Sequence, residues 1–228
     1  MDGGELGFFG QLSFLLDRGG PLMIPIGLCS VLGVAIVIER ILYLIWTHEN
    51  PAEVYEHVAE LTRGGRTREA LQYCQSQRGA LARTLGAGLT QFRKERRRME
   101  ETLAVAGQEQ LARIERRLRA LEVMASISPL LGLLGTVTGM IRAFQQVAAV
   151  EGSVSPALLA SGIWEALLTT AAGLMVAIPL MIFLHYFERK REKIGMGIEK
   201  YASLFMPVRE DLDEAQRPAT PVERKATG

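Results

Sequence analysis

The residue best placed to do chemistry is a carboxylate in an apolar part of the chain. Glu165 stands directly before residues 166–187, a run of 22 without Asp, Glu, Lys or Arg that is long enough to cross a bilayer. A carboxylate about two turns into a membrane helix costs several kcal/mol unless it is paired, protonated or hydrated. Glu165 therefore either lines an ion or proton path or forms an ion pair, and both can hold because intramembrane pairs often line pathways.

Arg142 is the candidate ion-pair partner, since it ends the preceding apolar run, 123–141. Counted from a hairpin near residue 152, Arg142 is ten residues away and Glu165 thirteen, a difference in depth of about 5 Å. Hydroxyls at Thr136, Thr169 and Thr170 are further candidates for lining an ion path. Most membrane threonines instead donate to the carbonyl four residues earlier, so a local bond is the alternative for each of them.

Small residues recur beside these polar groups at spacings of three and four. Such spacing puts them on one helix face and lets a neighbouring helix approach closely, so helix packing is the expected role. A membrane helix with one small, polar face cannot close a pore alone, which predicts oligomerisation. The predicted packing residues are Gly132, Gly135, Gly139, Gly162 and Gly173.

Other kinds of chemistry have little support in the sequence. The three histidines and two cysteines are scattered, and there is no phosphate-binding loop, so we expect no catalytic residues, no metal and no cofactor. The formal net charge is +1, which gives no basic field for nucleic acid. The basic run at 93–98 is followed at once by acids at 100 and 101, as on a solvated helix face. We expect a protein that is not an enzyme and does not bind nucleic acid.

The elements that must position these groups are helices, so the predicted fold is all-α. Three apolar stretches have the length of transmembrane helices, and the second and third are expected to extend into a cytoplasmic helical bundle. The predicted segments are an amphipathic N-terminal segment (1–20), the first span (21–46), a cytoplasmic helical region (47–122), the second span (123–147), a hairpin (148–157), the third span (158–187), a cytoplasmic helical extension (188–206) and a disordered tail (207–228).

The distribution of basic residues predicts the orientation in the membrane. Fourteen Lys and Arg lie between residues 47 and 120 and nine from residue 189 onward, whereas only Arg18 precedes the first span and none lies between 145 and 161. The positive-inside rule then places the N-terminus and the 148–157 hairpin in the periplasm, with the long loop and the C-terminus in the cytoplasm.

The cytoplasmic region carries helix signals of its own. Asn50 before Pro51 predicts a helix start, and Gly64–Gly65 predicts its end. A second short helix is expected over Arg68–Gln77. From about Met99 an apolar stripe at helical spacing runs without a break into the second span, which predicts one continuous helix.

Two stretches of the chain resemble a known family. Residues 132–140 read GLLGTVTGM and resemble the GLFGTVWGIM stretch of the ExbB/TolQ proteins, and residues 162–174 read GIWEALLTTAAGL and resemble their GIAEALLATAIGL stretch. With Ile178–Pro179, the order of three spans and the long cytoplasmic loop, the resemblance covers most of residues 21–205. On this basis the chain is identified as a member of the MotA/TolQ/ExbB proton channel family, within its ExbB/TolQ branch.

The resemblance implies a function that the residues alone do not reveal. Members of the family form a homopentameric ring in the bacterial inner membrane. The pore of that ring holds the single membrane helices of an ExbD/TolR-like partner, each with an essential aspartate. Proton flow drives the complex, and the partner passes the energy to a TonB- or TolA-like protein. By position, Glu165, Thr136 and Thr170 match the pore-lining polar residues of the family. The sequence departs from the family pattern at Thr169, often Ala, and at Arg142, often a neutral residue.

Several roles remain open from the sequence. ExbB-like service to outer-membrane import is the expected role, and the alternatives are a TolQ-like role in envelope integrity, a gliding or secretion motor, and a membrane scaffold that conducts no ions. Glu165 and Thr170 argue against the scaffold. Pairing of Glu165 with Arg142 would weaken that argument.

Overall fold

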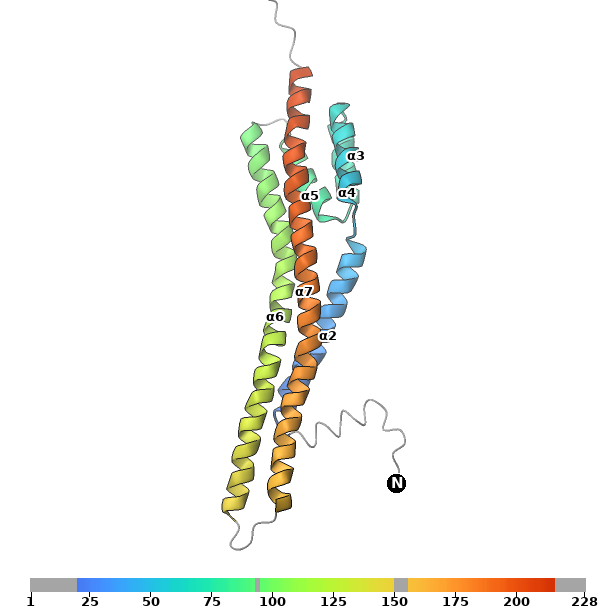
Figure 1. The fold of residues 1–228 in the computed structure, drawn as a ribbon. Coiled ribbons are helices and arrows are strands. Elements are labelled where there is room, and N and C mark those ends of the chain that lie inside the picture. The colour runs from blue at the N-terminus through green and yellow to red at the C-terminus, as the bar shows by residue number, and fades with distance from the viewer. Residues whose placement is uncertain (1–19, 93–94, 150–155, 216–228) are drawn as a thin grey trace, which may run out of the picture. The chain divides into compact units, whose positions relative to one another are not determined.

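The computed structural model describes residues 20–92, 95–149 and 156–215, and all regular structure in these ranges is helical (Figure 1). The all-α prediction is confirmed for this part of the chain. Three of its helices are long and apolar enough to cross a membrane. The helices are α2 (Met23–Trp46), α3 (Pro51–Arg63), α4 (Thr67–Ser76), α5 (Ala80–Thr90), α6 (Arg96–Ala148) and α7 (Pro156–Ala215).

Contacts within the chain divide it into two compact units. Of the described residues, unit 1 contains those within 20–41 and 116–188, and unit 2 those within 42–115 and 189–215. Each of α6 and α7 is one continuous helix that contributes to both units. The continuous helix predicted from about Met99 into the second span is thus present, and it begins at Arg96.

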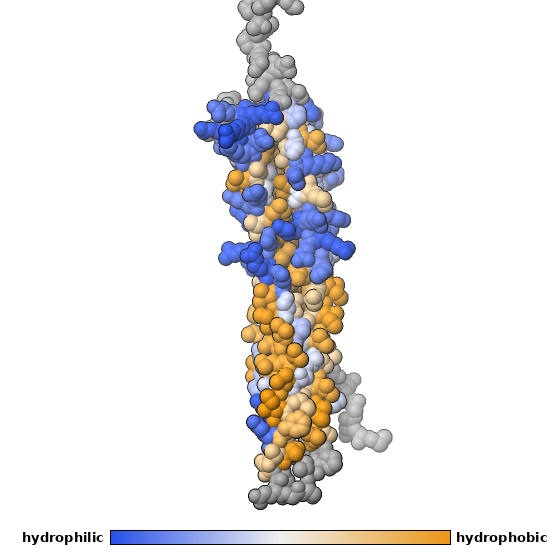
Figure 2. All heavy atoms as spheres, turned by 60° about the vertical axis from the view of Figure 1, so that its left-hand side comes forward, coloured by the Kyte–Doolittle hydropathy of each residue, from blue (hydrophilic) through white to orange (hydrophobic). Residues whose placement is uncertain are grey.

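Unit 1 contains the three apolar helical segments, and its surface is largely hydrophobic, coloured orange in Figure 2. Large apolar side chains stand outward on each segment, for example Val31 on α2, Leu130 on α6 and Met175 on α7. Soluble proteins rarely leave so much contiguous apolar surface uncovered, whereas lipid tails solvate it well. The outward faces of unit 1 are therefore those of a membrane protein.

Helix α2 packs against both partners in unit 1. Gly33 lies so close to α7 that a Cβ there would stand 2.6 Å from a methyl carbon of Leu180. At the other end of the apolar stretch, Arg117 of α6 donates to the carboxylate of Glu39 at 3.0 Å. Both partners of this pair are partly exposed, so the pair contributes little stability. It does favour the alignment in which this end of α2 lies beside α6.

Unit 2 has a conventional hydrophobic core, built by α3, α4 and α5 together with the parts of α6 and α7 that belong to it. Val58, Leu85, Met99 and Phe205 are among the side chains buried there. The start of α3 follows the prediction, because Asn50 caps it by accepting from the N–H of Ala52 at 3.2 Å. Its predicted end at the two glycines is also confirmed.

Two features of unit 2 differ from the sequence-based expectations. Helix α5 was not predicted, and α7 does not end before Pro207 but continues to Ala215. The predicted disordered tail is therefore wrong for residues 207–215. A helix that loses a backbone hydrogen bond at proline persists here because Phe205, Met206 and Val208 are buried in the core around it.

Three expectations fall outside the described residues. These are the amphipathic segment before residue 20, the part of the hairpin at 150–155 and the tail from residue 216 onward.

A half-buried carboxylate from outside α5 caps the start of that helix. Glu49, in the connection after α2, accepts from the backbone N–H groups of Leu81 at 2.7 Å and Ala82 at 3.4 Å. The N-cap residue of α5, Gly79, has no side chain to do this, and a Cβ there would collide with the Glu49 carboxylate. Burial raises the pKa of Glu49 above its ordinary value, and these hydrogen bonds offset that effect only in part.

Replacement of Glu49 by alanine is expected to lower the free energy of unfolding of unit 2 by about 1–3 kcal/mol, because it leaves buried N–H groups without an acceptor. Glu49→Gln keeps an acceptor and serves as the matched control. Thermal unfolding of the full chain in detergent micelles measures both. Equal losses in the two variants would contradict a capping role.

The raised pKa of Glu49 also predicts how the stability of unit 2 depends on pH. Since folding raises the pKa of Glu49 above 4.5, its contribution to stability is complete below that pH and is lost as the pH rises through the folded pKa. Relative to Glu49→Gln, the wild-type chain should therefore lose stability as the pH rises above 4.5. A stability difference that stays constant over this range would refute the raised pKa.

Candidate functional site

The predicted packing glycines form a seam between α6 and α7 within unit 1. A Cβ on Gly132 would lie 3.0 Å from the carbonyl oxygen of Thr169, and one on Gly173 would lie 2.6 Å from the carbonyl oxygen of Ser128. These neighbours are backbone atoms, which cannot rotate away. The two backbones can approach this closely only because both helices carry glycine at the contact. The complete seam comprises Gly132, Gly135, Gly139, Gly162 and Gly173, each against the other helix.

The two adjacent threonines of α7 have different surroundings. Thr169 is buried in the seam against Gly135, and its hydroxyl donates to the carbonyl of Ala166 at 2.7 Å. Thr170 is half-buried and donates across the helices to the carbonyl of Gly132 at 2.9 Å. The position of Thr169 is that of a packing residue. Thr170 joins α7 to α6 and still has part of its surface uncovered within this chain.

Replacement of Thr170 by valine should therefore weaken the seam. The variant keeps the shape but loses the interhelical hydrogen bond, which is worth about 0.5–2 kcal/mol in a membrane. Thr170→Ser keeps the hydroxyl and is the matched control. Steric trapping or unfolding of the full chain in bicelles gives the difference. A Thr170→Val variant as stable as Thr170→Ser would show that the bond contributes nothing.

Thr136 lies on α6 one turn after Gly132, at the border of the seam. Its hydroxyl donates to the carbonyl of Leu133, three residues earlier, at 2.7 Å, so it forms a local bond within α6. The residue borders an apolar hollow of about 700 Å³ on the surface of unit 1. The other residues lining this hollow are Val137, Met140, Ile141, Phe144, Gln145 and Ala148. The structure thus places Thr136 at the edge of an outward surface of unit 1.

Arg142 and Glu165 meet between α6 and α7. An Nη1 atom of Arg142 lies 3.9 Å from Oε1 of Glu165, with 54% of the Arg142 side chain and 38% of the Glu165 side chain exposed. The two residues are thus at matching depth, and the carboxylate has a cationic neighbour. The distance is at the long end for an ion pair, and the partial exposure leaves Glu165 reachable from outside the chain.

The pair also has a backbone neighbour that the sequence-based reasoning missed. Gly20, just before α2, lies so close that a Cβ there would be 2.6 Å from Oε1 of Glu165 and 3.7 Å from Nη1 of Arg142. Gly20 also has φ +68°, a conformation that favours glycine. A glycine pair before a proline at 19–21 is a turn signal, but nothing in the local sequence indicates what the turn contacts.

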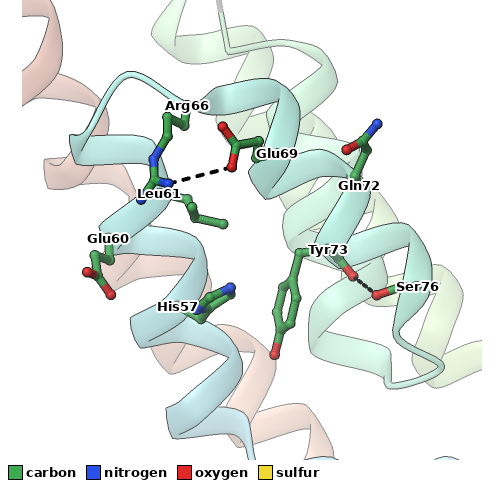
Figure 3. A pocket seen from close by; sticks show the side chains of 8 residues that line it. All are labelled: His57, Glu60, Leu61, Arg66, Glu69, Gln72, Tyr73 and Ser76. Carbon is green, nitrogen blue, oxygen red and sulfur yellow. Dashed lines mark hydrogen bonds and ion pairs between the residues drawn. The ribbon is translucent and has the colours of Figure 1, made fainter.

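A second hollow lies in unit 2, where α3 and α4 face each other across about 520 Å³ (Figure 3). His57 and Tyr73 approach across it with ring centroids 4.4 Å apart, and Arg66 lies 3.6 Å from Glu69 at its rim. Acidic, basic and aromatic side chains are mixed in this lining, so it selects no single ligand charge. The described part of the chain contains no group of three or more His, Cys, Asp or Glu that could hold a metal ion.

Comparison with known proteins gives a consistent result. The model of the MotA/TolQ/ExbB proton channel family matches residues 76–200. The biopolymer transport protein exbB1 of Vibrio cholerae is 34% identical over 172 residues, which is 74% of this chain and 75% of the relative. The biopolymer transport protein ExbB of Neisseria meningitidis is 26% identical over 84% of this chain and 94% of its own length. The Tol-Pal system protein TolQ of Pseudomonas aeruginosa is 35% identical, but over 42% of this chain and 41% of its own.

Proposed function

Because this chain belongs to the MotA/TolQ/ExbB proton channel family, we propose that it is the pore-forming subunit of an inner-membrane motor driven by the proton-motive force. In this role it works with an ExbD/TolR-like protein that has one membrane helix and a membrane aspartate. Together they transmit energy to a TonB- or TolA-like protein that spans the periplasm. The chain itself catalyses no covalent reaction, since the ion gradient supplies the free energy.

The observation that carries this proposal is the position of Glu165. It belongs to the apolar part of α7, yet its side chain is still 38% exposed within the chain. A carboxylate that served only as a structural partner would be expected to be covered by its own chain, because an uncovered charge in lipid costs several kcal/mol. An exposed carboxylate at this depth instead suits a water-filled or partner-filled space.

Outer-membrane import is the specific role that we propose. The support is the extent of the similarity, since the ExbB relatives align with most of this chain and the TolQ relative with less than half of it. An envelope-integrity role of the TolQ kind is the competing assignment. Import predicts that loss of the gene impairs uptake of a scarce nutrient through the outer membrane without making the envelope leak.

The proposed assembly is a homopentamer around a central pore. Two observations support this assembly. The glycines of α6 and α7 are occupied in the contact between these two helices, and apolar, partly hollowed faces, including the one bordered by Thr136, remain for neighbouring copies to cover. We further propose that the N-terminus lies in the periplasm and the C-terminus in the cytoplasm. The excess of Lys and Arg in residues 47–120 and after residue 189 supports this orientation.

Three residues are proposed to face the ion path: Glu165, Thr170 and Thr136. A partner aspartate that alternates between its neutral and charged forms would need polar contacts or water whenever it is ionised, and these side chains could offer them. Thr169 is left out of this role, since the seam covers its side chain almost completely. The positive charge of Arg142 would balance the negative charge of Glu165 in the ion path.

The test is purification of the full chain from its native membrane, followed by reconstitution into liposomes. We expect a single-span protein with a membrane aspartate to co-purify. We also expect the complex to take up protons when a potassium-valinomycin potential is applied. Liposomes with the chain but no partner are the control. A stable complex that passes no more protons than empty liposomes would overturn the proposal and favour a scaffold that conducts no ions.

A further inference from the structure

The start of α2 closes over the Arg142–Glu165 pair. Gly20 approaches both side chains, and the residues that follow it turn at once into α2, with the N–H of Met23 donating to the carbonyl of Gly20 at 3.1 Å. The pair is therefore bordered by three segments of unit 1: the entry to α2, the end of α6 and the early part of α7. The seam residues connect only the last two of these segments.

Two features favour glycine at this position. Its φ of +68° is unfavourable for residues with a side chain, and a Cβ would lie 2.6 Å from Oε1 of Glu165. Either the carboxylate or the turn would have to move to admit one. At Gly27, within α2, a Cβ would meet nothing within 4 Å, so the close approach is particular to Gly20.

The contacts on the carboxylate differ in kind. Arg142 supplies a positive charge from α6. The backbone of Gly20 lies beside the carboxylate and limits the rotation of the Glu165 side chain. A side chain with several rotatable bonds that is bounded on two sides loses most of its alternative positions. The rest of the Glu165 side chain, 38% of it, stays exposed.

We propose that Arg142 and the backbone of Gly20 are positioning groups that fix the Glu165 carboxylate for its work in the ion path. The Glu165 carboxylate can leave its position only if its contact with Arg142 breaks and the backbone at the entry to α2 moves. This inference rests on the proposed function, since it specifies how the carboxylate of that path is held. It also gives the first span a role in transport, through its entry rather than through its lipid-facing side.

The experiment uses the full chain with its co-purified partner in liposomes and two readouts. The first is proton uptake under an applied potential. The second is the infrared carboxylate stretching band of Glu165, identified as the band that disappears in Glu165→Gln. The test variants are Arg142→Gln and Gly20→Ala. Arg142→Lys keeps the charge, and Gly27→Ala places the same methyl group on α2 where there is room for it.

We expect Arg142→Gln and Gly20→Ala each to shift the Glu165 band and to lower proton uptake by at least about threefold, the effect of a modest coupling energy between contacting groups. Arg142→Lys should restore most of the uptake, and Gly27→Ala should behave as wild type in both readouts. If Gly20→Ala fails to assemble, the comparison of Arg142→Gln with Arg142→Lys decides the result. A Glu165 band that is the same in wild type, Arg142→Gln and Gly20→Ala overturns the inference.

The failure of this inference differs from the failure of the proposed function. If Glu165→Gln abolishes uptake but Arg142→Gln and Gly20→Ala leave it at the wild-type rate, the carboxylate works without being positioned by them, and only the inference is wrong. If Glu165→Gln itself transports at the wild-type rate, the role of Glu165 in the path is wrong, and its positioning for transport is refuted with it.

Discussion

Replacement of Glu165 by glutamine is expected to reduce ion-driven activity about 100-fold, equivalent to roughly 3 kcal/mol in the barrier. Glutamine has nearly the same shape, so α7 should still pack against α6 in the variant. What is lost is a negative charge that is partly exposed in an apolar part of the chain and has Arg142 beside it. Without that charge, a partner carboxyl loses a group with which it could share a proton or a water molecule, and Arg142 is left as an unbalanced cation.

The matched control is Glu188→Gln, the same substitution on the same helix at an exposed carboxylate near the end of unit 1. It should leave proton uptake within about twofold of wild type, as expected for a weak surface interaction. Glu165→Asp tests geometry against charge, because it keeps the charge but shortens the side chain. Equal activity of Glu165→Gln and Glu188→Gln would remove Glu165 from the ion path.

The second large effect is expected at Gly173. Valine at this position would press its branched side chain into the backbone of α6, where the carbonyl oxygen of Ser128 lies 2.6 Å from the first added carbon and Gly132 Cα lies 3.1 Å from it. Overpacking against side chains costs about 1–3 kcal/mol, and backbone atoms have fewer ways to yield. We expect Gly173→Val to lower stability by at least about 3 kcal/mol and to separate the two helices.

Ala171→Val supplies the control, because Ala171 stands on the exposed side of α7 only two residues away. The two variants add β-branched bulk at nearby positions of the same helix, so helix propensity affects both in a similar way. The measurements are thermal unfolding in detergent and the yield of protein assembled in membranes. A Gly173→Val chain that is as stable as Ala171→Val would mean that the seam is looser than its contacts indicate.

The spans and the all-α fold were predictable because the signals are local. A helix must be about 20 apolar residues long to cross lipid, and such runs are visible in one dimension. The α3 boundaries were predictable for a similar reason, since Asn50, Pro51 and the two glycines act on their immediate neighbours. Counting residues along the second and third spans also placed Arg142 and Glu165 within about 5 Å in depth, near enough for their side chains to meet.

Features set by distant residues were beyond such reasoning. Helix α5 has two internal glycines, Gly86 and Gly88, which lower helix propensity. The leucines at 81, 85 and 89 repeat every four residues and are the signal that could have identified it. Its cap comes from Glu49, more than 30 residues earlier in the chain, and no local pattern relates the two.

The roles of Thr169 and Thr170 illustrate a different limit. Neighbouring residues on a helix point about 100° apart, so one of the two can enter a seam while the other reaches across it. Which one does so depends on the rotation of α7 against α6, and that is set by the fit of the glycines. The contact of Gly20 with Glu165 likewise depends on where α2 enters unit 1, which hydropathy does not specify.

The glycine seam has a mechanical consequence for the motor that we propose. Side chains can shear past one another by changing rotamers, but backbones in direct contact at Gly132 and Gly173 have no such freedom. The apolar parts of α6 and α7 should therefore behave as a single stiff bar. Relative movement would have to occur at other surfaces, where long, flexible side chains form the contact. A torque applied to one of the two helices would move both, with little energy dissipated between them.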